Sequence, residues 1–326
     1  MNVIVRPRSP RRTIPVWLAL ALSVAGGGCG AAQAAVNGHL GERLGSPVLA
    51  AGVSNTFGGL LFIIATLALT RVRTGLGRIW RDRLPLWMYS GGLFGAFFVF
   101  AGAYAAPLIG VALFTVAQVC GNTMGALGCD AVGLGPSGRL RITVFRLTGA
   151  ITAIVAVAVA QAGRELHAAA WWLVPLVVVV GIGLSLQAAL NGRVNEIAGN
   201  PLSTGLVNFT VGTVALYLVI GVLALAVGFG DFRFPPQPWL YLGGLLGSAL
   251  LLCSVIAVKR IGVLRMALGI LAGQLAGALA IDIAGGRVPS AFTIAGLALT
   301  AVAGALAGRG ARAPSDADVQ RLTSRR

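Results

Sequence analysis

Charged residues are scarce in this chain of 326 residues: they make up 10% of it, where soluble domains carry about 25%. Hydrophobic residues make up 57%, more than a folded core of this size can hide from water. This composition excludes an ordinary soluble domain. It predicts a protein whose solvent is the lipid bilayer.

Residues that support catalysis and metal binding are also few. The two histidines, His39 and His167, fall at the ends of expected helices. The four cysteines form no CxxC pair and have no histidine at metal-ligand spacing. No Walker loop, HExxH motif, GxSxG motif or Ser/His/Asp constellation is present. We therefore expect a protein that is not an enzyme and that has no metal site and no cofactor.

Positive charge, in contrast, is in excess, with a formal net charge of +16. Nucleic-acid binding would require a basic face or stripe, whereas these residues lie between long apolar runs. If the N-terminus is inside, 21 of the 25 basic residues lie in inside loops and termini. The four outside are Arg43, Arg164, Arg233 and Arg287. This bias predicts cytoplasmic N- and C-termini and no nucleic-acid partner.

Ten apolar segments approach the length of about 20 residues that crosses a bilayer. They cover approximately residues 14–36, 47–70, 85–106, 108–134, 142–162, 171–191, 202–228, 238–258, 262–285 and 289–308. Backbone groups must be paired within the membrane and no alternating strand pattern is present, so all ten are expected to be helices. We expect a tight hairpin at Pro107, because proline cannot continue a helix interior without kinking it. Residues 71–84 are expected to be an inside loop.

The remaining ranges are short. Residues 1–13 are a basic cytoplasmic N-terminus, residues 163–170 an external connecting loop, and residues 309–326 a disordered cytoplasmic tail. The first apolar segment resembles a signal peptide and carries AQA at Ala32–Ala34. Cleavage after Ala34 would destroy a repeated phrase, so we expect the segment to be retained.

That phrase occurs twice, 154 residues apart. QAAVNGHLGERLGSP begins at Gln33 and QAALNGRVNEIAGNP begins at Gln187. Matches of Ala and Gly are expected by chance in this composition, but matches of Gln, Asn, Glu and Pro are not. The chain therefore contains an internal repeat.

Two further matches extend the repeat at an offset of 152. WMYSGGLFG from Trp87 matches WLYLGGLLG from Trp239, and GNTMGALGCDAVG matches GQLAGALAIDIAG. Residues 14–162 (the first half) thus repeat as residues 171–308 (the second half). Each half has five expected helices, an odd number, so the second half begins on the opposite side of the membrane. The predicted fold is all-α and integral to the membrane, with ten transmembrane helices in a 5+5 inverted-topology repeat.

This architecture resembles the drug/metabolite transporter superfamily. The twice-written QAA[VL]NG…GxP and the GQLAGALAID sequence are similar to its bacterial YdcZ-type branch, whose members are related to the EamA-like transporters. The resemblance covers nearly all of residues 14–308 and is closer in the second half. It implies a bacterial inner-membrane protein that transports small molecules, with export as the direction.

Polar residues are costly inside a membrane and are therefore candidates for function. Gln33 and Asn37 share one helix face, and Gln187 and Asn191 repeat it in the second half. Their carboxamides offer donors and acceptors to a solute, or they hydrogen-bond neighbouring helices. Both interpretations stay open. Asn55 and Asn208 are weaker candidates, because the repeat does not align them.

A second stripe lies on the fourth and ninth segments. Gln118, Asn122 and Asp130 follow one face, and Gln274 and Asp282 follow the matching face. We expect Asn122 and Gln274 to line a shared central cavity. The two aspartates are candidate gates or proton carriers, because a carboxylate in a low dielectric binds a proton more readily.

Asp130 has another interpretation. It is close in sequence to Arg139, Arg141 and Arg146 and pairs with one of them. Asp282 has only Arg287 nearby, so of the two aspartates it is the expected proton carrier.

The function predicted from these features is a secondary transporter that exports a small metabolite by alternating access. The alternative is a non-transporting membrane scaffold or a subunit that binds a partner. A scaffold needs no second, inverted copy of the polar stripes. A small-molecule substrate and the bilayer are the expected partners, and a homodimer is left open.

Overall fold

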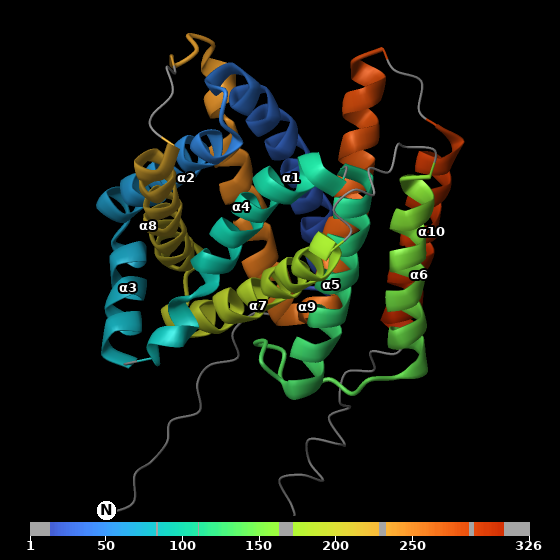
Figure 1. The fold of residues 1–326 in the computed structure, drawn as a ribbon. Helices are drawn as coiled ribbons and strands as arrows, with labels where there is room; N and C mark the ends of the chain where they lie inside the picture. Colours follow the sequence, from blue (N-terminus) through green and yellow to red (C-terminus); the bar gives the residue numbers. More distant parts are fainter. Residues whose placement is uncertain are drawn as a thin grey trace, which may run out of the picture.

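The computed structural model describes residues 14–82, 84–109, 111–162, 172–227, 233–286 and 290–309, and the regular structure in these ranges is entirely helical (Figure 1). The α-helices found there are α1 (Val16–Leu44), α2 (Pro47–Ala68), α3 (Thr70–Asp82), α4 (Gly91–Ile109), α5 (Val111–Val132), α6 (Val144–Ala160), α7 (Val174–Ala198), α8 (Pro201–Val227), α9 (Gly243–Ala284) and α10 (Ala291–Arg309). The 3-10 helices η1 (Leu86–Tyr89) and η3 (Pro238–Tyr241) precede α4 and α9. Each apolar segment expected from the sequence overlaps one of these helices, and two of the segments overlap α9.

Within the described ranges, six helical stretches are long and apolar enough to cross a membrane. They are Val16–Leu44, Pro47–Ala68, Val174–Ala198, Pro201–Ala226, Pro238–Ala284 and Ala291–Arg309. Large apolar side chains on their surfaces remain exposed, among them Ile64 at 62% and Leu218 at 65%. An apolar surface of this kind is suited to contact with lipid.

The longest helix, α9, is broken at one residue. Gly262 has φ 79° and ψ 171°, outside the helical region, and glycine adopts this conformation without the penalty that a Cβ would bring. Figure 1 shows that the chain turns back there, so that the two parts of α9 run in different directions. The loop expected between residues 258 and 262 is therefore a turn at a single glycine.

Two connections between helices differ in the structure from those expected from the sequence. α4 continues through Pro107 to Ile109, and α5 begins at Val111; residue 110, between them, lies outside the described residues. The hairpin is thus not at Pro107, since membrane helices tolerate a proline where neighbouring groups satisfy the freed backbone groups.

The expected loop at residues 71–84 contains the amphipathic helix α3. Val72, Gly75 and Ile79 are buried and share one face. Arginines of α3 bind the ends of two other helices: Nη1 of Arg73 donates to Leu67 O at 2.6 Å, and Nη1 of Arg78 donates to Ala198 O at 3.3 Å. The segment was expected to be a loop, whereas it contains a helix that Arg73 and Arg78 attach to α2 and α7.

The repeated glycines make equivalent contacts in two helix pairs. Between α5 and α7, a Cβ on Gly121 would collide with the carbonyl of Val178, and a Cβ on Gly181 would collide with the carbonyl of Gln118. Glycine is therefore required for the two backbones to approach this closely.

The same contacts recur between the second part of α9 and α1. A Cβ on Gly273 would collide with the carbonyl of Val24, and a Cβ on Gly27 would collide with the carbonyl of Ile270. Each of these four residues is related to its counterpart by an offset of 152 or 154. Each pair joins a helix of the first half to a helix of the second half.

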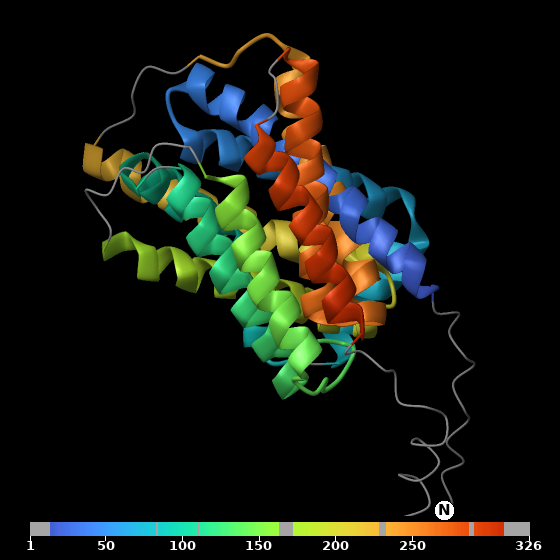
Figure 2. The ribbon, with the colours of Figure 1, turned by 90° about the vertical axis from the view of Figure 1, so that its right-hand side faces the viewer.

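α6 and α10 form a separate pair on one side of the molecule and lie side by side in Figure 2. Gly149 of α6 packs against Ala303 and Ala307, while Gly296 of α10 packs against Ala156 and Ala160. The fifth expected helix of each half is therefore in contact with the fifth helix of the other.

Candidate functional site

The amide groups of Gln33 and Asn37 on α1 lie directly against the first part of α9. A Cβ on Gly247 would collide with the Gln33 amide, and a Cβ on Gly243 would collide with Oδ1 of Asn37. The GGLLG sequence of α9 therefore provides the surface on which these candidate residues rest.

α7 repeats this arrangement on α4. A Cβ placed on Gly95 would lie 3.0 Å from Nε2 of Gln187, and a Cβ placed on Gly91 would lie 2.6 Å from Oδ1 of Asn191. The repeated Gln-x-x-x-Asn pattern of each half thus packs on the repeated glycine pattern of the other half.

Asn208 on α8 connects the two amides of α7. Its Oδ1 accepts a hydrogen bond from Nε2 of Gln187 at 3.2 Å and one from Nδ2 of Asn191 at 2.9 Å. Asn191 and Asn208 are buried. In the second half the carboxamides therefore hydrogen-bond neighbouring helices, as in the packing interpretation.

The residue equivalent to Asn208 in the first half is Ser54, 154 positions earlier. Asn55, the neighbouring asparagine, has another role: its Nδ2 donates to Phe209 O at 3.1 Å and to Oγ1 of Thr213 at 2.7 Å. These bonds join α2 to α8. Sequence reasoning compared Asn55 with Asn208 and missed Ser54, although the offset of 154 identifies it.

Asn122 and Gln274 occupy equivalent places in two different helix pairs. Oγ of Ser185 on α7 donates to Oδ1 of Asn122 on α5 at 2.7 Å, and Gln118 lies one turn earlier on α5. Gln274 on α9 is exposed, and its Nε2 would lie 3.5 Å from a Cβ on Gly30 of α1. Their lining of one common cavity stays a prediction.

Asp130 is a buried contact between three helices. Its carboxylate pairs with Arg146 at the start of α6, and it is 1% exposed. Its oxygens also accept hydrogen bonds from the backbone N–H groups of Val263 at 2.8 Å and Leu264 at 3.1 Å. Asp130 thus caps the second part of α9 where that part begins after Gly262, at a helix end that favours negative charge.

The segment after α5 strengthens this contact. Leu140 N donates to Asp130 O at 2.7 Å, and Oγ of Ser137 donates to Val258 O at 2.7 Å. Of the arginines near Asp130 in sequence, Arg146 is its partner, whereas Nε of Arg139 donates to Ala131 O. Residues 133–140 therefore hold the end of α5 against the turn in α9.

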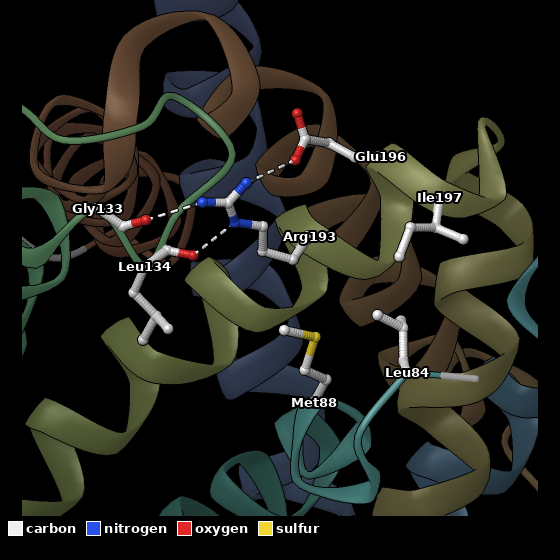
Figure 3. A pocket seen from close by; sticks show the side chains of 7 residues that line it. All are labelled: Leu84, Met88, Gly133, Leu134, Arg193, Glu196 and Ile197. Atoms are coloured by element: carbon white, nitrogen blue, oxygen red, sulfur yellow. Dashed lines mark hydrogen bonds and ion pairs between the residues drawn. The ribbon is translucent and has the colours of Figure 1, made fainter. Parts of the chain in front are cut away.

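A cavity of about 360 Å³ lies beside this segment and is drawn in Figure 3. Leu84, Met88, Leu134 and Ile197 give it apolar walls, and Gly133, Arg193 and Glu196 complete its lining. Polar and apolar groups therefore meet in it, as in many small-molecule sites.

The guanidinium of Arg193 binds three groups at the edge of this cavity. It donates to Gly133 O at 2.8 Å, to Leu134 O at 3.0 Å and to Oε2 of Glu196 at 3.1 Å. These bonds attach the end of α7 to the end of α5. Sequence reasoning missed Arg193 and Glu196, although the repeated phrase contained the signal: His39 and Glu42 stand at the equivalent positions.

His39 and Glu42 form a similar pair near the end of α1. Nδ1 of His39 lies 3.4 Å from Oε2 of Glu42, and the imidazole packs edge-on against Trp239. Both side chains are exposed. The equivalent positions of the two halves thus carry an arginine in one half and a histidine in the other.

Asp282 lies in the last turn of α9 and is half-buried, between Ile281 and Ile283, which are 41% and 56% exposed. Its side chain is thus less buried than that of Asp130. Arg287, its expected neighbour, lies outside the described residues, and a proton-carrying role for Asp282 stays a prediction.

Two comparisons with known sequences bear on this arrangement. The model of the family described as "Putative inner membrane exporter, YdcZ" matches residues 18–159 and 172–308. The chain is also 29% identical over 106 residues to the inner membrane protein YdcZ of Escherichia coli (strain K12). That alignment covers 71% of the relative but 32% of this chain, so the relative is less than half as long.

A solved crystal structure shares the fold. It has a TM-score of 0.66 and 20% sequence identity, and the match covers 90% of this chain and 96% of that one. The helices of this chain are therefore arranged as in a protein of known structure.

Proposed function

Because this chain belongs to the YdcZ family, a family of inner membrane proteins, we propose that it is a secondary transporter that exports a small solute by alternating access between two inverted halves. Its membership and its long apolar helices make it a multi-pass inner membrane protein. The ten-helix topology, the transport mechanism and the direction are parts of the proposal.

The main support for the proposal is the helix packing that is repeated in the two halves. The contacts of Gly121 and Gly181 between α5 and α7 recur as the contacts of Gly273 and Gly27 between α9 and α1. Because each half packs on a helix of the other half, two equivalent halves can pack in two similar arrangements. Transporters built from inverted repeats alternate between two such arrangements to give access from one side of the membrane and then from the other. The family model supports the same division, since its two matches fall one on each half.

The distribution of basic residues supports cytoplasmic termini. Contacts bring α3, the end of α7, residues 133–140 and the turn at Gly262 to one end of the molecule. Arginines are concentrated in these elements, as the positive-inside rule requires of the cytoplasmic side. This end of the molecule is proposed to face the cytoplasm.

At this same end, hydrogen bonds of charged side chains connect the helices. Asp130 holds the turn in α9, and Arg193 holds the end of α5. In the proposed mechanism, these bonds keep the cytoplasmic end shut and must break for a solute to enter from inside. The cavity beside Arg193 would then be the first part of the pathway to widen.

Comparing the metabolites of a deletion strain and an overexpressing strain tests the function. The proposal expects one class of small solute to accumulate in the first and to be depleted in the second. Uptake of that solute into inverted membrane vesicles containing the protein should then exceed uptake into vesicles that lack it. Unchanged metabolites and no uptake would favour a scaffold or partner-binding subunit.

A further inference from the structure

The short helix α3 lies at the edge of the molecule and is covered by protein on one side (Figure 1). Val72 and Ile79 are 0% and 7% exposed, and Val72 O accepts a hydrogen bond from Oγ of Ser203 on α8 at 2.9 Å. On the opposite side, four polar residues spaced by three and four positions form an exposed stripe: Arg71, Thr74, Arg78 and Arg81. The protein therefore covers the apolar side of an amphipathic helix and leaves its basic side free.

One large apolar side chain of α3 is left uncovered. Leu76 packs against the buried cluster that contains Ile79, whereas Trp80, one turn later at the border of the apolar side, is 87% exposed. Shortly after the helix, Leu86 is 87% exposed and Trp87 is 52% exposed. Tryptophan is enriched at the boundary between membrane and water, because its ring is apolar and its N–H group is polar. The uncovered border of α3 is therefore suited to that boundary.

The basic side of α3 carries charge that its own residues do not balance. The helix has four arginines and one acidic residue, Asp82. Arg73 and Arg78 donate to backbone carbonyls, which carry no net charge. Within the described ranges, neither Arg71 nor Arg81 has an ion pair or a side-chain hydrogen bond. An exposed guanidinium beside an exposed tryptophan favours a partner with both an anionic group and apolar chains.

We propose that α3 is an interfacial helix whose outer side binds the headgroups of anionic lipids. Arg81 binds the phosphate of a lipid whose acyl chains lie beside Trp80, since a guanidinium matches the geometry of a phosphate. Arg71 lies ten residues earlier, about 15 Å along the helix, and binds a second lipid. The assignment to the cytoplasmic leaflet rests on the proposed orientation of the termini, whereas lipid binding does not.

The probe is phosphatidylglycerol, and phosphatidylcholine, which has no net charge, is the reference. The full-length protein is placed in vesicles of both lipids, one of them brominated on acyl carbons near the headgroup so that it quenches tryptophan on contact. The chain has six tryptophans, so the quenching that is lost in Trp80→Phe reports Trp80. At low salt, one arginine strengthens the attraction to anionic lipid about fivefold. The quenching of Trp80 should therefore show about that preference for phosphatidylglycerol.

Substitutions of exposed arginines separate this site from a general effect of charge. Arg81→Gln should remove the preference that Trp80 shows. Arg260→Gln, at an exposed position of α9, removes the same charge and should leave the preference unchanged. Equal losses in the two variants would overturn the site, as would equal quenching of Trp80 by the two lipids in the wild type.

Thermal unfolding in detergent provides a second measurement. Arg73 and Arg78 attach α3 to α2 and α7, so lipid bound to α3 should stabilise the folded protein. Phosphatidylglycerol should raise the unfolding midpoint more than phosphatidylcholine does, and Arg71→Gln and Arg81→Gln should each reduce the difference. An equal rise with inorganic phosphate would overturn the lipid as the partner. Neither measurement involves solute transport, so failure here leaves the proposed function intact, and a lack of transport leaves this site intact.

Discussion

Asp130 on α5 and Arg146 on α6 form an ion pair in which the aspartate is 1% exposed and the arginine 2% exposed. The aspartate also accepts two backbone hydrogen bonds from the start of the second part of α9. One carboxylate therefore connects α5, α6 and α9. Because every partner is buried, this residue should be among the most sensitive in the protein.

Asp130→Asn should lower the free energy of unfolding by about 3–5 kcal/mol, because it leaves the buried Arg146 guanidinium without a counter-charge. Thermal unfolding in detergent checks this. Glu42→Gln, which changes an exposed pair, is the matched control and should cost under about 1 kcal/mol. Replacing Asp130 and Arg146 together by leucine should cost less than the sum of the two single changes. Simple additivity would contradict the pairing.

Gly121→Ala and Gly128→Ala should have opposite effects, although both glycines lie on α5. A Cβ at position 121 collides with the Val178 carbonyl, whereas one at position 128 meets nothing within 4 Å. Gly121→Ala should therefore lower stability by about 1–3 kcal/mol. Gly128→Ala should raise it by up to about 1 kcal/mol, since alanine favours the helix. Equal effects would contradict the close packing of α5 on α7.

The helices and the repeat could be predicted from the sequence because both are local patterns. Long apolar runs require helices in a membrane, and the repeated Gln, Asn, Glu and Pro reveal the duplication without any structure. α3 was missed because 13 residues with four arginines have low overall hydropathy, although Val72 and Ile79 mark its buried face.

The partners of the polar residues were harder to predict. Asp130 caps a helix that begins 133 residues later, and the offset of the repeat gives no information about that contact. The arginines near Asp130 in sequence were considered as partners, but the selection of Arg146 depends on the path of residues 133–140. Ser54 was overlooked because serine is an ordinary residue on a membrane helix, and only the offset of 154 relates it to Asn208.

Topology can be tested with two single cysteines in a variant whose four native cysteines are replaced by alanine. Arg71→Cys lies on α3 and His39→Cys lies near the end of α1, and both positions are exposed. A membrane-impermeant maleimide should label residue 39 in spheroplasts and residue 71 in inverted vesicles. Labelling of both from the same side would contradict the proposed ten-helix arrangement.

Leucine replacements at Asn122 and Gln274 test the expected central cavity. If their carboxamides line the pathway, the double variant should lose most solute efflux while its amount in the membrane stays near normal. Thr148→Leu, an exposed position on α6, is the control and should leave efflux unchanged. Asn122 also accepts a hydrogen bond from Ser185. Equal losses of protein and of efflux would therefore indicate helix packing as its main role.

Of the two aspartates in the repeated stripe, Asp282 is the one that we predict to carry a proton. Asp130 accepts hydrogen bonds from Arg146 and from two backbone N–H groups, and a proton on its carboxylate would disrupt that set. Asp282 is half-buried and lies in the last turn of α9. A carrier must be reached from water and must exchange its proton, so the less buried of the two carboxylates is the better candidate.

Asp282→Asn keeps the shape of the side chain and removes its ionisation. If transport is driven by protons through this residue, the variant should lose solute accumulation that depends on a pH gradient, by at least about tenfold. Exchange of solute without net proton movement should remain, because the pathway is intact. The measurement is uptake into vesicles over a range of external pH. An unchanged pH profile would exclude Asp282 as the carrier, and the carboxylate would then be a contact at the end of α9.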